Sequence, residues 1–210
     1  VTTPDVANGS GAANVAATLV NDSNADVSAA VKTTIIDKYS GTAVGSAETT
    51  VNVPANGTAV ANTAPAASDY ALWSIEHPNL YTCRIFLSRD GRCLDKMEVK
   101  VGFRTIEFTE NDFLLNGKKT FLRGLNRHQC YPYVGYAVPE ALQREDVRIL
   151  KEELGCNAVR TSHYPQSKYF IDECDRLGLL VFTEIPGWQH IGGESWKDQA
   201  VENTREMVLQ

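Results

Sequence analysis

The sequence has 210 residues, of which 43% are hydrophobic and 22% are charged, and its formal net charge is −6 at pH 7. This length and composition are typical of a globular protein with one large core or two smaller ones, and they exclude a disordered chain. The negative charge removes the attraction on which nucleic-acid binders depend, and no apolar run is long enough to span a bilayer. We therefore expect neither nucleic acid nor a membrane as a partner.

The first part of the chain is poor in charge, since residues 1–68 contain only seven charged side chains. β-Branched residues alternate there with polar ones, and turn-forming clusters recur about every ten residues, as in an antiparallel β-sandwich. This pattern predicts an immunoglobulin-like β-sandwich over residues 1–104, without the Cys–Trp–Cys spacing of antibody domains. Its strands are expected at 15–20, 29–37, 47–53, 58–63, 81–88 and 93–102.

The pattern changes after the sandwich. Asn116–Gly117 lies between residues 113–115 and 118–122, and this dipeptide favours a two-residue type I′ turn because both positions require positive φ. We predict a tight hairpin here, at the beginning of a second domain over residues 105–210.

Helices alternate with apolar strands in the rest of the chain. Helix 140–154 places five apolar residues on one face, helix 166–177 ends at Gly178, and helix 195–209 begins with Ser195 as its cap. Strands are expected at 121–125, 158–161 and 179–183, and residues 179–182 of the third are all apolar, as in strands buried on both faces. The apolar face of the first helix is expected to contain Leu142, Val147, Ile149, Leu150 and Leu154.

Successive βα units predict a parallel sheet, and a closed (β/α)8 barrel requires eight units. Residues 105–210 provide three, so we predict the N-terminal part of such a barrel, three of its eight units. Three parallel strands leave edges with unpaired N–H and C=O groups. The sequence therefore predicts self-association through the open barrel edge, or disorder of the last helix.

Polar residues follow each predicted barrel strand, at the end where parallel α/β folds bind their ligands. Imidazole, guanidinium and carboxylate groups can bond to sugar hydroxyls, and an aromatic ring can cover the apolar face of a sugar. We therefore predict a site for a polyhydroxylated ligand. Its substrate-binding residues are expected to be Asn126, His128, Arg160, His163, Glu184 and Trp188.

Some of these residues have alternative interpretations. Arg127 either holds the strand end through a salt bridge or contacts the ligand, and Trp188 either caps the rim or stacks on a sugar ring. Arg160 lies between apolar residues and needs a ligand or a carboxylate partner, for which Glu184 is a candidate.

A metal-dependent hydrolase is an alternative function, with His128, His163 and Glu184 as zinc or iron ligands. The histidines do not occur in a His-x-His or His-Glu-x-x-His arrangement. The five cysteines have irregular spacing and predict neither a zinc site nor a disulfide framework. We therefore expect no metal and no cofactor.

Several strings resemble glycoside hydrolase family 2, which contains β-galactosidases, β-glucuronidases and β-mannosidases. They are LWSIEHPNLY at 72–81, GFR at 102–104, NGK at 116–118, LRGLNRH at 122–128 and NAVRTSHYP at 157–165, in the family's order. The resemblance implies a jelly roll, an immunoglobulin-like domain and a (β/α)8 barrel. The chain is thus expected to be a fragment with the second domain and the first part of the third.

The resemblance also implies residue roles. His128, Arg160 and His163 match the family's pocket residues, and Glu184 matches the acidic residue that ends the third strand. Gln129 stands where glutamate often follows the histidine. The implied substrate is a β-linked oligosaccharide or glycoside, and the EIPGW string at 184–188 most resembles β-galactosidases.

Retaining glycosidases use two carboxylates, which this family carries as glutamates after the fourth and seventh barrel strands, the first in an Asn-Glu dipeptide. The 210 residues contain no Asn-Glu dipeptide, so both glutamates are expected beyond Gln210. The chain is therefore predicted to contain no catalytic residue and to be inactive alone. A non-catalytic carbohydrate-binding or assembly module is the other alternative.

Overall fold

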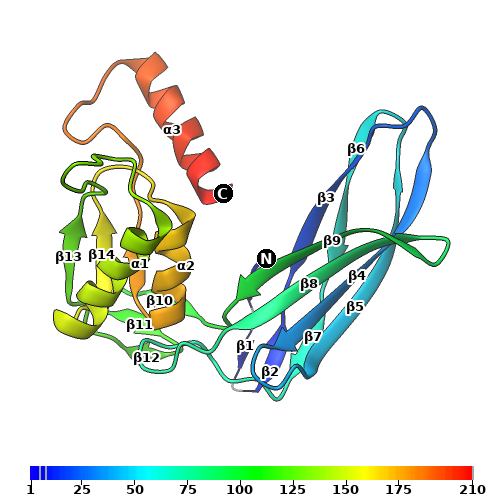
Figure 1. The fold of residues 1–210 in the computed structure, drawn as a ribbon, viewed down its shortest axis with the longest axis horizontal. Coiled ribbons are helices and arrows are strands. Elements are labelled where there is room, and N and C mark those ends of the chain that lie inside the picture. Colours follow the sequence, from blue (N-terminus) through cyan, green and yellow to red (C-terminus); the bar gives the residue numbers. More distant parts are fainter. Residues whose placement is uncertain (5, 8, 210) are drawn as a thin grey trace. The chain divides into compact units, whose positions relative to one another are not determined.

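The computed structural model of the protein describes residues 1–4, 6–7 and 9–209. The chain divides into two compact units, Val1–Thr120 and Phe121–Gln210 (Figure 1). No helix among the described residues is long and apolar enough to cross a membrane.

The first unit is an immunoglobulin-like β-sandwich made of two antiparallel sheets. The large sheet has the strand order β1-β2-β7-β5-β4-β8-β9, and β3 pairs with β6 in the small one (Figure 1). The six predicted strands correspond to β3, β4, β5, β6, β8 and β9. The strand bounds are β1 Val6–Ala7, β2 Ser10–Ala12, β3 Val15–Asn21, β4 Val27–Asp37, β5 Ala43–Val53, β6 Gly57–Thr63, β7 Ala66–Ser68, β8 Tyr81–Arg89 and β9 Arg92–Val101.

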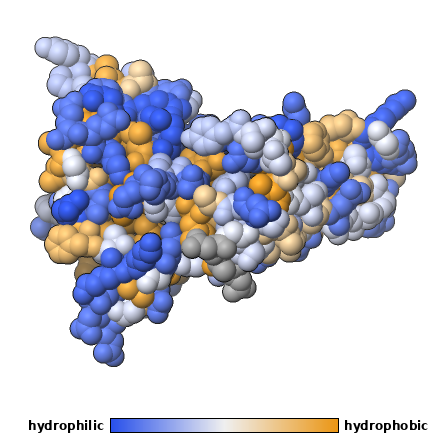
Figure 2. Space-filling view, turned by 90° about the horizontal axis from the view of Figure 1, so that it is seen from below, coloured by the Kyte–Doolittle hydropathy of each residue, from blue (hydrophilic) through white to orange (hydrophobic). Residues whose placement is uncertain are grey.

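The alternation in the sequence produces the core of this unit. Along β4 every second residue, from Ala29 to Ile35, is buried. The stacked rings of Tyr70 and Phe103 have centroids 4.0 Å apart and fill one end of the core. Residues of intermediate hydropathy, drawn pale, cover much of the sandwich surface on the right of Figure 2, in keeping with its low charge.

The predicted hairpin is present. Strands β10 (Ile106–Phe108), β11 (Phe113–Leu115) and β12 (Lys118–Lys119) form a small antiparallel sheet. Asn116 and Gly117 have φ angles of 52° and 71°, as a type I′ turn requires. The Asn116 side chain accepts a hydrogen bond from the Thr105 N–H and donates one to the Trp73 carbonyl, which holds the hairpin against the rest of the first unit. The predicted domain boundary at residue 104 stays a prediction.

The second unit is part of a TIM barrel. Strands β13 (Gly124–Arg127), β14 (Ala158–Thr161) and β15 (Leu180–Phe182) are parallel and adjacent in chain order. The helices that follow them are α1 (Glu140–Arg148), which continues as a π-helical turn to Glu153, then α2 (Lys168–Leu177) and α3 (Glu194–Leu209). Self-association through the sheet edges stays a prediction.

Helices α1 and α2 pack side by side and cover one face of this sheet (Figure 1). Val159 and Val181 are paired in register and belong to the apolar cluster beneath these helices. The next row, Asn126, Arg160 and Phe182, points to the opposite face because side chains alternate along a strand.

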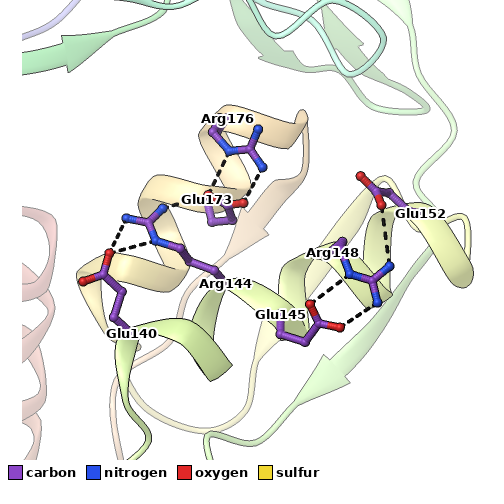
Figure 3. A network of polar contacts seen from close by, with 7 residues as sticks. All are labelled: Glu140, Arg144, Glu145, Arg148, Glu152, Glu173 and Arg176. Atoms are coloured by element: carbon purple, nitrogen blue, oxygen red, sulfur yellow. Dashed lines mark hydrogen bonds and ion pairs between the residues drawn. The ribbon is translucent and has the colours of Figure 1, made fainter.

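An ion-pair network joins α1 to α2 (Figure 3). Glu173 of α2 is 5% exposed and accepts hydrogen bonds from Arg144 of α1, at 2.8 Å, and from Arg176, at 2.9 Å. Arg144 also bonds to Glu140, one helical turn earlier. The network thus compensates a buried carboxylate between the two helices.

Three predictions about the second unit need correction. The first strand begins at Gly124 rather than at residue 121, because the Asn157 side chain bonds to the Phe121 carbonyl and the Arg123 N–H. Leu154 is 55% exposed, because the π-helical turn shifts it off the apolar face of α1. Helix α3 begins at Glu194, so Ser195 is not its cap.

The third barrel strand is also less buried than predicted. Leu180 is buried, but Phe182 is 39% exposed, because it faces the side of the sheet that α1 and α2 do not cover.

Candidate functional site

The candidate site lies at the carboxyl ends of the three parallel strands. Asn126 and Arg160 are paired in register on the face without helices. His128 directly follows β13, while His163 and Glu184 each come two residues after the last residue of their strand. The Ser162–His163 peptide bond is cis. The order of the strands therefore brings side chains from three sequence segments to one end of the sheet.

Arg160, His163 and Glu184 form a hydrogen-bonded cluster. Arg160 Nη2 lies 2.8 Å from Glu184 Oε2, and His163 Nδ1 lies 2.9 Å from Glu184 Oε1. A carboxylate only accepts hydrogen bonds, so Nδ1 carries the ring hydrogen and donates it to Glu184. In the neutral ring Nε2 is then an acceptor, so the cluster can offer both a donor, Arg160, and an acceptor to a hydroxyl group.

Aromatic rings border this cluster. The rings of His128 and His163 meet edge to face with centroids 5.3 Å apart, and Trp188 stacks on His163 at 5.3 Å with an interplanar angle of 27°. Trp188 is 68% exposed, so much of its indole surface is free of the described residues. An exposed indole beside hydrogen-bonding groups suits the mixed polar and apolar surface of a sugar.

The structure thus brings five of the six candidate residues into a connected group, and the strand register places the sixth, Asn126, beside Arg160. The expected carboxylate partner of Arg160 is confirmed as Glu184. Substrate binding by the six residues remains a proposal.

Arg127 has the structural role that the sequence left open. Its side chain is 6% exposed and pairs with Asp146 of α1 at 2.6 Å. It also donates to Gln143 and Gln166, and its guanidinium lies 4.1 Å from the centroid of the Phe170 ring. Arg127 therefore fixes the end of β13 against α1 and α2.

The geometry gives no support to the metal-dependent alternative. Among the described residues, no three His, Cys, Asp or Glu side chains are arranged to hold a metal ion. The Glu184 carboxylate is already engaged by the Arg160 guanidinium, which would repel a cation.

Two residues beside this cluster, Gln129 and Tyr136, were not among the predicted site residues, although Gln129 had been noted as a departure from the family's pattern. The Tyr136 ring meets that of Tyr164 edge to face at 5.9 Å, and Tyr164 lies 6.4 Å from His128. Burial raises the pKa of Tyr164, so its hydroxyl stays protonated at neutral pH, and it accepts a hydrogen bond from the Gln129 N–H. The sequence contains a signal that could have revealed Tyr136, since three tyrosines occur within six residues soon after His128.

The arrangement combines hydrogen-bonding groups with a ring surface, the kinds of group that contact a polyol. A retaining glycosidase needs two carboxyl groups about 5 to 5.5 Å apart. The cluster described above contains one carboxylate, Glu184, and Arg160 and His163 both bond to it. Fold and site together therefore define part of a TIM barrel with a cluster of polar and aromatic side chains at the carboxyl ends of its strands.

The family follows from comparison with known sequences. Residues 1–104 match the model "Glycosyl hydrolases family 2", and residues 106–207 match "Glycosyl hydrolases family 2, TIM barrel domain". The chain belongs to glycoside hydrolase family 2.

Similar proteins differ in their named sugars. A β-galactosidase of Thermoanaerobacterium thermosulfurigenes is 54% identical over 140 residues, and one of Thermoanaerobacter pseudethanolicus is 55% identical over 138. These matches cover 67% and 65% of this chain and 19% of each relative. The crystal structure of a Bacteroides uniformis β-glucuronidase matches with a TM-score of 0.88 and 28% identity, covering 99% of this chain and 25% of that one.

Proposed function

We propose that this chain is part of a retaining glycoside hydrolase that cleaves terminal β-glycosides, with β-galactosides as its substrates. Residues 1–210 would bind the terminal sugar through Asn126, His128, Arg160, His163, Glu184 and Trp188 without hydrolysing it. The observation that carries the proposal is the Arg160–Glu184–His163 cluster beside an exposed indole.

A neutral sugar suits this cluster better than an anionic one. Glu184 neutralises the charge of Arg160, so an approaching uronate would meet a carboxylate as well as the guanidinium. The two relatives named β-galactosidase are also more similar to the chain than a relative named putative β-glucuronidase, at 54–55% against 40% identity over segments of similar length. The first argument favours a neutral sugar over a uronate, and the second favours a galactoside.

Titration of the 210-residue chain with methyl β-galactoside and methyl β-glucuronide, followed by NMR, tests the proposed binding. The galactoside should bind, and Arg160→Ala should weaken it about tenfold or more, because a hydrogen bond from a charged group is lost. Arg205→Ala, which removes an exposed arginine of α3, is the matched control and should bind like the wild type. Preference for the glucuronide would contradict the choice of sugar.

The absence of catalysis has its own assay. Incubation of the chain with an aryl β-galactoside should release no more phenol than an unrelated control protein, because the two catalytic glutamates are expected outside these residues. Turnover above that control would show that a carboxylate pair is present in these 210 residues.

A further inference from the structure

The segment 131–136, directly after the candidate site residues of β13, forms a small closed loop. Tyr131 and Gly135 exchange two backbone hydrogen bonds, of 3.0 and 2.9 Å. This closure presents the tip of the loop outward, where Tyr133 is fully exposed and Tyr136 is 64% exposed. Exposed tyrosines on a closed loop are typical of binding surfaces, since a rigid ring loses little conformational entropy on contact.

The loop extends the ring cluster of the candidate site. From Trp188 the rings run through His163, His128 and Tyr164 to Tyr136, with neighbouring centroids 5.3 to 6.4 Å apart. The charged groups lie at one end of this row, where Arg160 and Glu184 contact His163. The other end consists of tyrosine rings.

Gln129 holds the tyrosine end in place with three hydrogen bonds. Its N–H donates to the Tyr164 hydroxyl at 3.0 Å, its side-chain carbonyl accepts from the Ser167 N–H at 3.1 Å, and its amide nitrogen donates to the Tyr136 carbonyl at 3.5 Å. A side-chain amide can donate and accept at the same time, whereas an ionised carboxylate can only accept. A glutamate here would place a carboxylate against the Tyr136 carbonyl, so the glutamine is matched to this loop.

We propose that Tyr136, with Tyr133 at the loop tip, forms a second subsite for the group linked to the terminal sugar, and that Gln129 is its positioning residue. This inference rests on the proposed function. The polar end binds the hydroxyls of the terminal sugar, while the tyrosine end stacks on a second sugar ring or an aryl group. The substrate class is therefore a β-linked oligosaccharide or aryl β-glycoside rather than a glycoside with a small aglycone.

The experiment compares the affinity of the 210-residue chain for lactose and for methyl β-galactoside, which lacks the second ring. The wild type should bind lactose more tightly than methyl β-galactoside. Tyr136→Ala should lower the affinity for lactose about three- to tenfold without changing the affinity for the methyl glycoside. Tyr39→Ala removes a tyrosine of the first unit that is even more exposed, at 80%, and should change neither affinity. Gln129→Glu should weaken lactose alone, and NMR spectra should show that both units stay folded.

The outcomes separate the two proposals. Equal loss for both ligands in Tyr136→Ala, or no loss for either, would overturn the second subsite and leave the sugar site in place. Failure of the wild-type chain to bind either ligand would overturn the proposed function and this inference together. If the Gln129→Glu variant binds lactose like the wild type, Gln129 does not position the second subsite.

Discussion

The interiors of the two units differ in how they treat polar groups. In the sandwich, the buried residues are almost all apolar, and Thr33 bonds to Thr63 at 2.8 Å in a neutral hydroxyl pair. In the barrel unit, Arg127 and Glu173 are both buried and charged; Arg127 bonds to two residues of α1 and to Gln166, and Glu173 bonds to one arginine of each of α1 and α2.

This difference follows from what each unit must position. The sandwich only has to keep two sheets packed, for which apolar burial suffices. The barrel unit has to hold strand ends and the loops that follow them, and directional bonds to a buried guanidinium fix their orientation as well as their distance. Removal of one polar partner should therefore cost more in the barrel unit than in the sandwich.

The largest effect is expected for Arg127→Ala. The change leaves Asp146 without its ion-pair partner and Gln143 without a donor, so we expect the barrel unit to lose about 3–5 kcal/mol of unfolding free energy. Amide hydrogen exchange of β13 and β14 under native conditions measures this unit separately from the sandwich.

The matched control for Arg127 is Arg84→Ala in the sandwich. Arg84 pairs with Glu98 at 2.6 Å, but its side chain is 40% exposed, so the change should cost about 1 kcal/mol or less. Equal losses of unfolding free energy in Arg127→Ala and Arg84→Ala would mean that burial does not determine how strongly these ion pairs stabilise the protein.

An intermediate effect is expected for Glu173→Gln. The hydrogen bonds from Arg176, and then those from Arg144, hold the pKa of Glu173 below its ordinary value of 4.5 although burial opposes them. The folded state therefore binds a proton less readily than the unfolded state, and the stabilisation present above about pH 5 is lost as the pH falls through the folded-state pKa.

The variant should accordingly lose about 1.5–3 kcal/mol at pH 7, and its barrel unit should be less sensitive to acid than the wild type. Hydrogen exchange of β14 at pH 7 and pH 4 measures both effects. Glu202→Gln on α3, where the carboxylate is exposed and also paired with an arginine, should leave the stability unchanged. If Glu173→Gln loses stability in acid as the wild type does, the acid sensitivity of the barrel unit does not come from Glu173.

The smallest effect for a buried polar group is expected inside the sandwich. Thr33→Val leaves the buried hydroxyl of Thr63 without its partner and should cost about 1–2 kcal/mol, whereas the double change Thr33→Val and Thr63→Val should be nearly neutral. Hydrogen exchange of β4 and β6 provides the measurement. A double variant as unstable as the single one would show that the two hydroxyl groups stabilise the sandwich by more than their hydrogen bond to each other.

Much of the fold could be predicted from local sequence pattern. Alternation located the sandwich strands, and Asn116–Gly117 located the hairpin, because both depend on residues close in sequence. Long-range contacts caused the errors. The start of β13 depends on a side chain 36 residues beyond Phe121, and the exposure of Leu154 depends on a π-helical turn that periodicity does not reveal.

For the candidate site, the residue types were predictable but their partners were not. Topology alone places the ends of parallel strands together, which is why His128, Arg160, His163 and Glu184 could be grouped. The bracing role of Gln129 required the structure, since its three partners come from separate positions in the chain.

The amino-acid sequence by itself determined the order of the elements, the two-domain composition and the family, because these depend on local periodicity and short strings. Only the tertiary structure decided which arginine is structural and which faces the open side of the sheet. Arg127 and Arg160 both lie on barrel strands, and their roles differ because side chains on a strand alternate between faces and only one face is covered by α1 and α2.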